Sequence, residues 1–227
     1  MGYLLAAGSQ ININLGTTLR KPSSSILIIL ALSVLTLAPS ILILLTGFTR
    51  IVIVLGLTRQ ALGLSTTPPN QVLVGVALFV SIFLMEPTLS VLNHVALQPY
   101  LHGQLTFSQA LHVGEVPVKR WLLAQTGPQE LALVAKLAHA KASHPMSLPL
   151  PTLIPAFLLN QLKDAFIIGF VIYVPFLVID LVVASTLMSM GIVMLPPTLV
   201  SLPFKLLLFV LVDGWVLVIQ ALVVGYR

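Results

Sequence analysis

Four long runs of apolar residues, separated by more polar stretches, dominate the pattern of this chain. They cover residues 26–46, 72–91, 165–190 and 199–224. A helix needs roughly 20 apolar residues to cross the ~30 Å hydrocarbon core of a bilayer, and each run is about that long. Backbone polar groups in lipid must be satisfied within helices or closed barrels. The pattern therefore predicts an all-α membrane protein.

The four runs form two pairs on either side of a polar region, which predicts how the chain is divided. We expect an N-terminal segment at 1–25, a first hydrophobic hairpin at 26–92, a small polar helical domain at 93–163 and a second hydrophobic hairpin at 164–227. The segment at 1–25 has no basic residues before its short apolar stretch, so we interpret it as at most a remnant of a signal peptide. Loop charges are balanced between the two sides and indicate no orientation.

The polar region contains one clear amphipathic helix, in the stretch TGPQELALVAKLAHAK. We expect Thr126 to cap it, with Gln129 at the capping-box position and Pro128 in the first turn. A short helix at 118–125 is expected before it. The stretch at 144–155 is so rich in proline that we predict an extended linker.

Composition supports a membrane setting and excludes some functions. Hydrophobic residues make up 58% of the chain and charged residues 7%, whereas about a quarter of a soluble domain is charged. The net charge of +5 is scattered, and no more than two basic residues are consecutive. A basic stripe for nucleic-acid binding is absent, so no nucleic-acid partner is expected.

Prolines lie inside the first, third and fourth apolar runs. Pro39, Pro175 and Pro203 each remove a helix hydrogen bond that lipid cannot replace. Such breaks are best tolerated against protein, so we expect the hairpins to be packed into an oligomer more than surrounded by lipid.

Charged residues also lie in or beside the C-terminal runs. Asp180, Lys205 and Asp213 would each cost about 2.5–3.5 kcal/mol at the centre of a bilayer. We favour a buried structural ion pair between Asp180 and Lys205, because breaking such a pair costs several kcal/mol. The alternative is that Asp180 is a proton relay in a proton-coupled secondary transporter.

Signatures of enzymes are missing from the sequence. The chain has no cysteine, and it contains no HExxH, GxSxG or GxxxxGK[ST] motif. The histidines have no metal-ligand spacing, so we predict no metal site, no cofactor and no catalytic residue. An aspartyl dyad of Asp180 and Asp213 is less favoured than two separate structural carboxylates.

Three stretches are more specific than hydrophobic bias alone. They are LLTGFTRIVIVLGLTRQALG at 44–63, PPNQVLVGVALFVSIFLMEP at 68–87 and the long segment at 162–215. All three closely resemble the FliP family of bacterial flagellar biosynthetic proteins. The resemblance continues more weakly through the polar region and covers nearly everything after residue 24. The injectisome relatives of the SctR family share the architecture, but GFTRIVIVL and PPNQVL are more similar to the flagellar branch.

The resemblance implies an all-helical subunit of the flagellar type III export gate. Such subunits form a pentameric ring with FliQ and FliR, next to FlhA and FlhB, in the basal body at the bacterial inner membrane. The channel would pass unfolded flagellar proteins, and the polar domain would face the periplasmic side. An injectisome gate subunit remains the alternative within this architecture.

The resemblance also gives a role to the segment TLMSMGIVMLPP. The family places a methionine-rich loop at the narrowest point of the pore, and we call residues 188–194 the methionine loop. Its predicted gate residues are Met188, Met190, Gly191, Ile192, Val193 and Met194. Thioether side chains are flexible enough to repack around a passing chain, whereas β-branched residues are stiffer. The two β-branched positions therefore predict a stiffer gate than an all-methionine loop.

Four further residues are predicted to act in assembly: Arg50, Arg59, Asn70 and Asp213. The two arginines flank a short apolar stretch, and they are either snorkelling anchors or contacts between subunits. Asp213 is eight residues after Lys205, so we expect both on one helix face.

Overall fold

The computed structural model describes residues 43–139, 144–192 and 194–226, together with 28–29, 32–33, 36 and 40. The expectations for residues 1–25, Pro39 and Val193 lie outside the described residues. Within the described part every regular element is a helix, and the predicted all-α fold class is confirmed.

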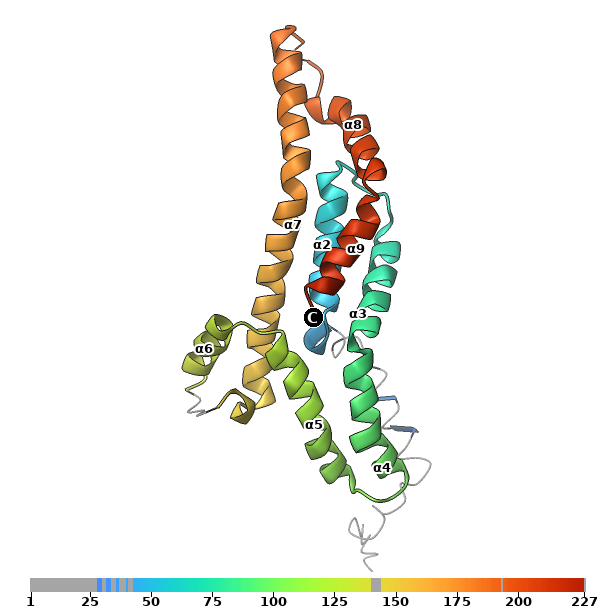
Figure 1. Cartoon of the computed structure of the whole chain (residues 1–227), viewed down its shortest axis with the longest axis vertical. Helices are drawn as coiled ribbons and strands as arrows, with labels where there is room; N and C mark the ends of the chain where they lie inside the picture. The colour runs from blue at the N-terminus through green and yellow to red at the C-terminus, as the bar shows by residue number, and fades with distance from the viewer. Residues whose placement is uncertain are drawn as a thin grey trace, which may run out of the picture.

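The described helices form an elongated subunit, in which α2 is enclosed by α3, α7 and α9 (Figure 1). In chain order they are α2 (Phe48–Ala61), α3 (Asn70–Leu92), a π-helical turn (Asn93–Leu97), α4 (Gln98–Leu101), α5 (Phe107–Ala124), α6 (Pro128–Leu137), a 3₁₀ turn (Pro145–Ser147), α7 (Leu150–Ser189), α8 (Pro197–Leu211) and α9 (Gly214–Val224). The connection between α7 and α8 lies at one end of the molecule, far from α4 and α5.

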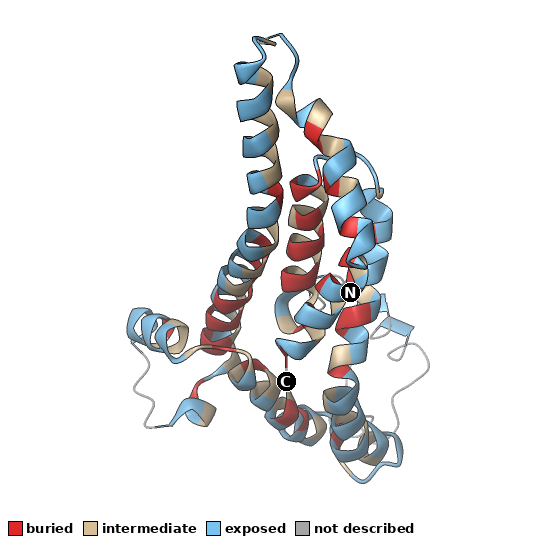
Figure 2. Cartoon of the chain, turned by 45° about the horizontal axis from the view of Figure 1, so that its top comes forward, coloured by how far each residue is buried: buried red, intermediate tan, exposed pale blue. Residues whose placement is uncertain are grey.

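The main hydrophobic core surrounds α2. Ile51, Val54 and Leu55 of α2 have essentially no exposed surface. Helix α7 passes closely, because Gly169 lies so near the side chain of Leu57 that a Cβ at this position would overlap it. Figure 2 shows the contrast between the largely buried α2 and the exposed upper part of α7. Small residues at such contacts allow helices to approach in a membrane protein.

Helix α7 is longer than predicted and begins inside the expected linker. It runs for 40 residues from Leu150, so the prediction of an extended segment is wrong for residues 150–155. Pro151 lies in the first turn, where its missing N–H has no intrahelical partner to lose. Pro155 and Pro175 lie within the helix, as does Pro203 in α8.

The polar region contains two helices whose starts differ from expectation. Helix α5 is longer than the predicted 118–125 and begins with a capping box of Thr106 and Gln109. Helix α6 does start at Pro128, but its N-cap is Gly127. The predicted Thr126 cap is wrong, because this hydroxyl donates to the Leu122 carbonyl of the preceding turn at 2.6 Å.

Among the residues that the structure describes, two helical stretches are long and apolar enough to cross a membrane: Asn70–Leu101 and Leu150–Ser189. The pair α8 and α9 would make a third if counted as one span, although it is bent by 62°.

Candidate functional site

The methionine loop forms the tip between α7 and α8. Gly191 has a left-handed φ of +73°, and its N–H donates to the Met188 carbonyl at 3.0 Å. The next N–H, of Ile192, donates to the Leu187 carbonyl at 3.0 Å. These two bonds are the Schellman arrangement that ends a helix on glycine. Pro196 then precedes the first turn of α8.

The methionines of this loop face away from the subunit. Met188, Met190 and Met194 are 70%, 67% and 98% exposed. Ile192 is half-buried, and Val193 lies outside the described residues. Three exposed apolar side chains at one tip have no packing partner in a single subunit, which is typical of a surface that contacts another molecule.

Behind the tip, α7 and α8 enclose an apolar groove of about 490 Å³. Its lining comes almost entirely from aliphatic side chains, with Phe204 at one side and Thr186 near the loop.

An ionic site below this groove joins α7, α8 and the end of α2; we call it the upper anchor. Lys205 Nζ donates to Asp180 Oδ2 at 2.6 Å and to the Ala61 carbonyl at 3.1 Å. Ser201 Oγ donates to Asp180 Oδ1 at 2.5 Å. The structure thus brings together the two residues predicted to pair, and Lys205 is only 3% exposed.

The geometry of the upper anchor is that of a satisfied ion pair. Both carboxylate oxygens of Asp180 accept a hydrogen bond, and the ammonium also interacts with the carbonyl end of α2, where a helix dipole favours a cation. A proton relay needs a carboxylate that is free to exchange its partner. Both oxygens of Asp180 are already bonded, so this arrangement favours a structural role.

Arg50 lies inside the subunit, at the other end of α2. It is 2% exposed; its Nη2 donates to Asp164 Oδ2 at 2.7 Å and its Nη1 to the Gly225 carbonyl at 3.4 Å. Its guanidinium carbon lies 4.2 Å from the ring centroid of Tyr226, a cation–π contact. This burial within its own chain does not fit a snorkelling anchor, and the predicted role of Arg50 in assembly stays a prediction.

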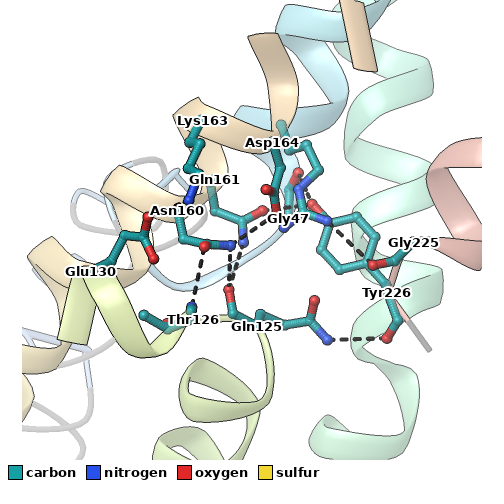
Figure 3. A network of polar contacts seen from close by, with 12 residues as sticks. Gly47, Gln125, Thr126, Glu130, Asn160, Gln161, Lys163, Asp164, Gly225 and Tyr226 are labelled. Atoms are coloured by element: carbon teal, nitrogen blue, oxygen red, sulfur yellow. Dashed lines mark hydrogen bonds and ion pairs between the residues drawn. The ribbon is translucent and has the colours of Figure 1, made fainter. Parts of the chain in front are cut away.

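Arg50 is one member of a polar network, shown in Figure 3, that we call the clasp. Its members are Arg50, Gln125, Asn160, Gln161, Asp164 and Tyr226. They come from α2, the turn between α5 and α6, α7, and the segment after α9.

Tyr226 is the aromatic member of the clasp. Its hydroxyl lies 2.8 Å from Gln161 Oε1 and 3.1 Å from the Gly47 carbonyl. Its ring stacks on Trp121, with centroids 6.0 Å apart and planes 6° apart. Burial raises the pKa of the Tyr226 phenol, so it keeps its proton and remains a hydrogen-bond donor.

Amide side chains tie the α5–α6 turn to the same place. Gln125 Nε2 donates to the Tyr226 carbonyl at 3.1 Å, and the Gln125 carbonyl accepts from Asn160 Nδ2 at 3.0 Å. Asn160 Nδ2 also lies 2.9 Å from Asp164 Oδ2. Nearby, Lys163 donates to Glu130 Oε1 at 2.8 Å, and this hydrogen bond lowers the pKa of Glu130.

Arg59 and Asn70, both assigned to assembly, meet within the chain. Arg59 Nη1 donates to Asn70 Oδ1 at 2.7 Å and to the Pro68 carbonyl at 3.0 Å. These bonds close the loop between α2 and α3.

Asp213 does not share a helix face with Lys205, so that prediction is wrong. Helix α8 ends at Leu211, and Asp213 is exposed at the start of α9 with a left-handed φ of 52°. A short polar side chain such as aspartate tolerates this conformation better than most residues. The residue marks the bend between the two helices.

No group of three or more His, Cys, Asp or Glu residues is close enough to hold a metal ion in the part of the chain that the structure describes.

Comparison with known proteins decides the family. The FliP family model matches residues 31–222. The chain belongs to the FliP family. It is 48% identical to the flagellar biosynthetic protein FliP of Bacillus subtilis over 219 residues, covering 95% of this chain and 98% of the relative. It is 46% identical to FliP of Aquifex aeolicus, covering 89% and 86%, and 48% identical to FliP of Cereibacter sphaeroides, covering 89% and 67%.

Membership of the FliP family assigns the general role. The chain is a component of the flagellar protein export apparatus that works with other export proteins, and it is not an enzyme. Its long apolar helices fit a membrane-embedded component.

Sequence reasoning did not find the clasp of this FliP protein. The sequence places Arg50 at the edge of an apolar stretch, and no motif in it singles out Asp164, Gln125 or Tyr226. One sequence feature does point to the clasp. Asp164 directly precedes the apolar run at 165–190, and a carboxylate beside such a run needs a cationic partner.

Proposed function

We propose that this FliP chain is a subunit of the channel that passes unfolded flagellar proteins across the bacterial inner membrane, within the basal body. Its copies form a pentameric ring with FliQ and FliR, next to FlhA and FlhB. The methionine loop forms the constriction of that channel, and the polar region at 93–163 faces the periplasmic side.

Extensive exposed apolar surface supports assembly into a larger complex. Phe79 and Phe83 on α3 and Phe166 and Phe170 on α7 are all more than half exposed. Such surface needs lipid or protein over it, and the upper part of α7 also carries the apolar groove against α8. In a ring, neighbouring subunits would cover this apolar surface.

The observation that carries the proposed constriction is the exposed methionine tip. Gly191 turns the chain so that Met188, Met190 and Met194 project from the end of two helices. Unbranched thioethers change rotamer easily, so a ring of them could close on itself and also repack around many different side chains. Apolar constrictions of this kind also exclude water and ions.

Replacing Met188, Met190 and Met194 together by alanine tests the constriction. We expect the complex, purified with FliQ and FliR and placed in liposomes, to leak small ions at least about tenfold faster while its assembly is unchanged, because truncation opens an apolar barrier. Ion flux and native mass spectrometry measure the two properties.

Met146 offers a matched control, since it lies in the 3₁₀ turn of the polar region, far along the chain from the loop. Met146→Ala should leave the leak unchanged. An unchanged leak in the triple variant together with lost assembly would assign the three methionines to packing between subunits and contradict a constriction. A chain that never joins a larger complex would contradict the proposed function as a whole.

A further inference from the structure

Helix α9 is attached differently at its two ends. At its start, the exposed Asp213 adopts a left-handed conformation and the chain bends by 62° between α8 and α9. At its end, Gly225 and Tyr226 enter the clasp. An 11-residue helix thus lies between a bend and a set of polar contacts.

The bend has the properties of a hinge. A non-glycine residue with positive φ is strained relative to the right-handed region, and a break in helical hydrogen bonding separates α8 from α9. Changes of φ and ψ at a few residues between elements are how hinges absorb rotation. Phe209 of α8 packs against Gly214 and Trp215 across the bend, so a rotation of α9 about this point must displace that aromatic contact.

The contacts at the other end are polar and come from several elements. The Tyr226 hydroxyl is close to Gly47 and Gln161, its carbonyl accepts from Gln125, and Arg50 lies over its ring. Gly47 allows this approach, since a Cβ there would overlap the Tyr226 phenol. Hydrogen bonds of this kind have a small net free energy each and are therefore releasable one group at a time.

We propose that α9 is a strap, hinged at Asp213 and fastened at Tyr226 by the clasp. When the clasp opens, α9 turns away from α2 while the rest of the subunit stays folded. The strap also connects the polar region to the C-terminal apolar segments through Gln125. The Gln125 side chain donates to the Tyr226 carbonyl, and the Gln125 main-chain carbonyl accepts from Asn160 of α7. A displacement of the α5–α6 turn would thus unfasten the strap. This proposal is independent of what the assembled complex conducts.

The absence of cysteine from the chain makes site-specific labelling a direct test. Val218→Cys places a thiol on the inner face of α9, where the native side chain is 5% exposed. Ala77→Cys, at a fully buried position of α3, reports on the core outside the strap. The rate of maleimide labelling of the full chain in membranes is measured for each thiol.

We expect Tyr226→Ala to raise the labelling rate at position 218 about tenfold or more and Tyr226→Phe to raise it less, because the latter keeps ring stacking and the cation–π contact. Position 77 should stay protected in both. Tyr173→Phe is the matched control: this half-buried α7 tyrosine has no hydrogen-bonded hydroxyl in the described structure, so both rates should be unchanged.

Two results would overturn the strap. Unchanged labelling at position 218 in Tyr226→Ala would show that the clasp does not hold α9. Faster labelling at both positions would show that Tyr226 supports the whole fold and does not fasten a separately moving element.

Discussion

The clasp and the upper anchor lie at opposite ends of α2, and both use a carboxylate of α7, but they are built differently. In the clasp, Arg50 meets Asp164 among amides, a phenol and main-chain carbonyls. In the upper anchor, Lys205 and Asp180 have only one hydroxyl and one carbonyl beside them.

The difference does not lie in how many acceptors each cation has. Arg50 donates to Asp164 and to the Gly225 carbonyl, and Lys205 donates to Asp180 and to the Ala61 carbonyl. In the described part of the chain the Arg50 Nε–H is buried without a hydrogen-bond partner, and the guanidinium lies over the Tyr226 ring. The amides and the phenol around this pair join four segments, whereas the upper anchor is a compact pair beside the groove and the methionine loop.

The largest effect should come from removing the acid of the clasp. Asp164→Leu leaves the buried Arg50 charge without its carboxylate, and breaking a buried pair in this way costs about 3–5 kcal/mol. Thermal unfolding of the purified chain measures the loss. Asp164→Asn, which keeps an acceptor oxygen, should recover part of it; equal losses for both variants would show that this oxygen contributes nothing without the carboxylate charge.

The corresponding change at the upper anchor should cost less. Asp180→Leu leaves Lys205 bonded to the Ala61 carbonyl at the C-terminal end of α2, so the loss should fall at or below the lower end of the about 3–5 kcal/mol range. The same thermal unfolding measurement checks this.

Adding Lys205→Leu to Asp180→Leu separates a structural pair from a proton relay. Removing both charges should restore much of the stability, since apolar replacement of a whole buried pair is often neutral or better. Restored assembly and export in this double variant would support the structural role. Restored assembly with no export would support a chemical role for the carboxylate.

The smallest effect concerns the hydroxyl beside Asp180. Ser201→Ala removes one hydrogen bond to a carboxylate, which is worth about 1.5–3 kcal/mol, and the partly exposed Asp180 can recover some of that from solvent. We therefore expect about 1.5 kcal/mol in the same unfolding measurement. A loss as large as that of Asp180→Leu would mean that Ser201 holds the pair together.

The sequence predicts the features that depend on a single helical run or on a single pair of opposite charges. The apolar runs identified the long helices, and Lys205 is the one base within the C-terminal pair of runs, in which Asp180 and Asp213 are the acids. Gly191 was recognisable because a glycine after an apolar helix and before two prolines is a common way to end it.

Other features could not be read from local pattern. The clasp combines positions more than 170 residues apart, and no periodicity connects Arg50 with Tyr226. The prolines at 144–155 predict an extended linker, whereas α7 begins at Leu150 with Pro151 in its first turn. A proline is compatible with a helix at that position, so proline content alone does not locate the start of α7. The Thr106 capping box was present in the sequence, whereas Thr126 had a competing carbonyl one turn earlier.

The packing of α7 has a mechanical consequence. Between Asp164 and Asp180 the helix is held in the core around α2, through Gly169 and Phe176 among others. Beyond the upper anchor the nine residues after Asp180 form an arm of about 14 Å, and a tilt of about 5° about Asp180 would move its tip by about 1 Å. The Asp180–Lys205 pair thus lies at the base of the short arm that positions the methionines.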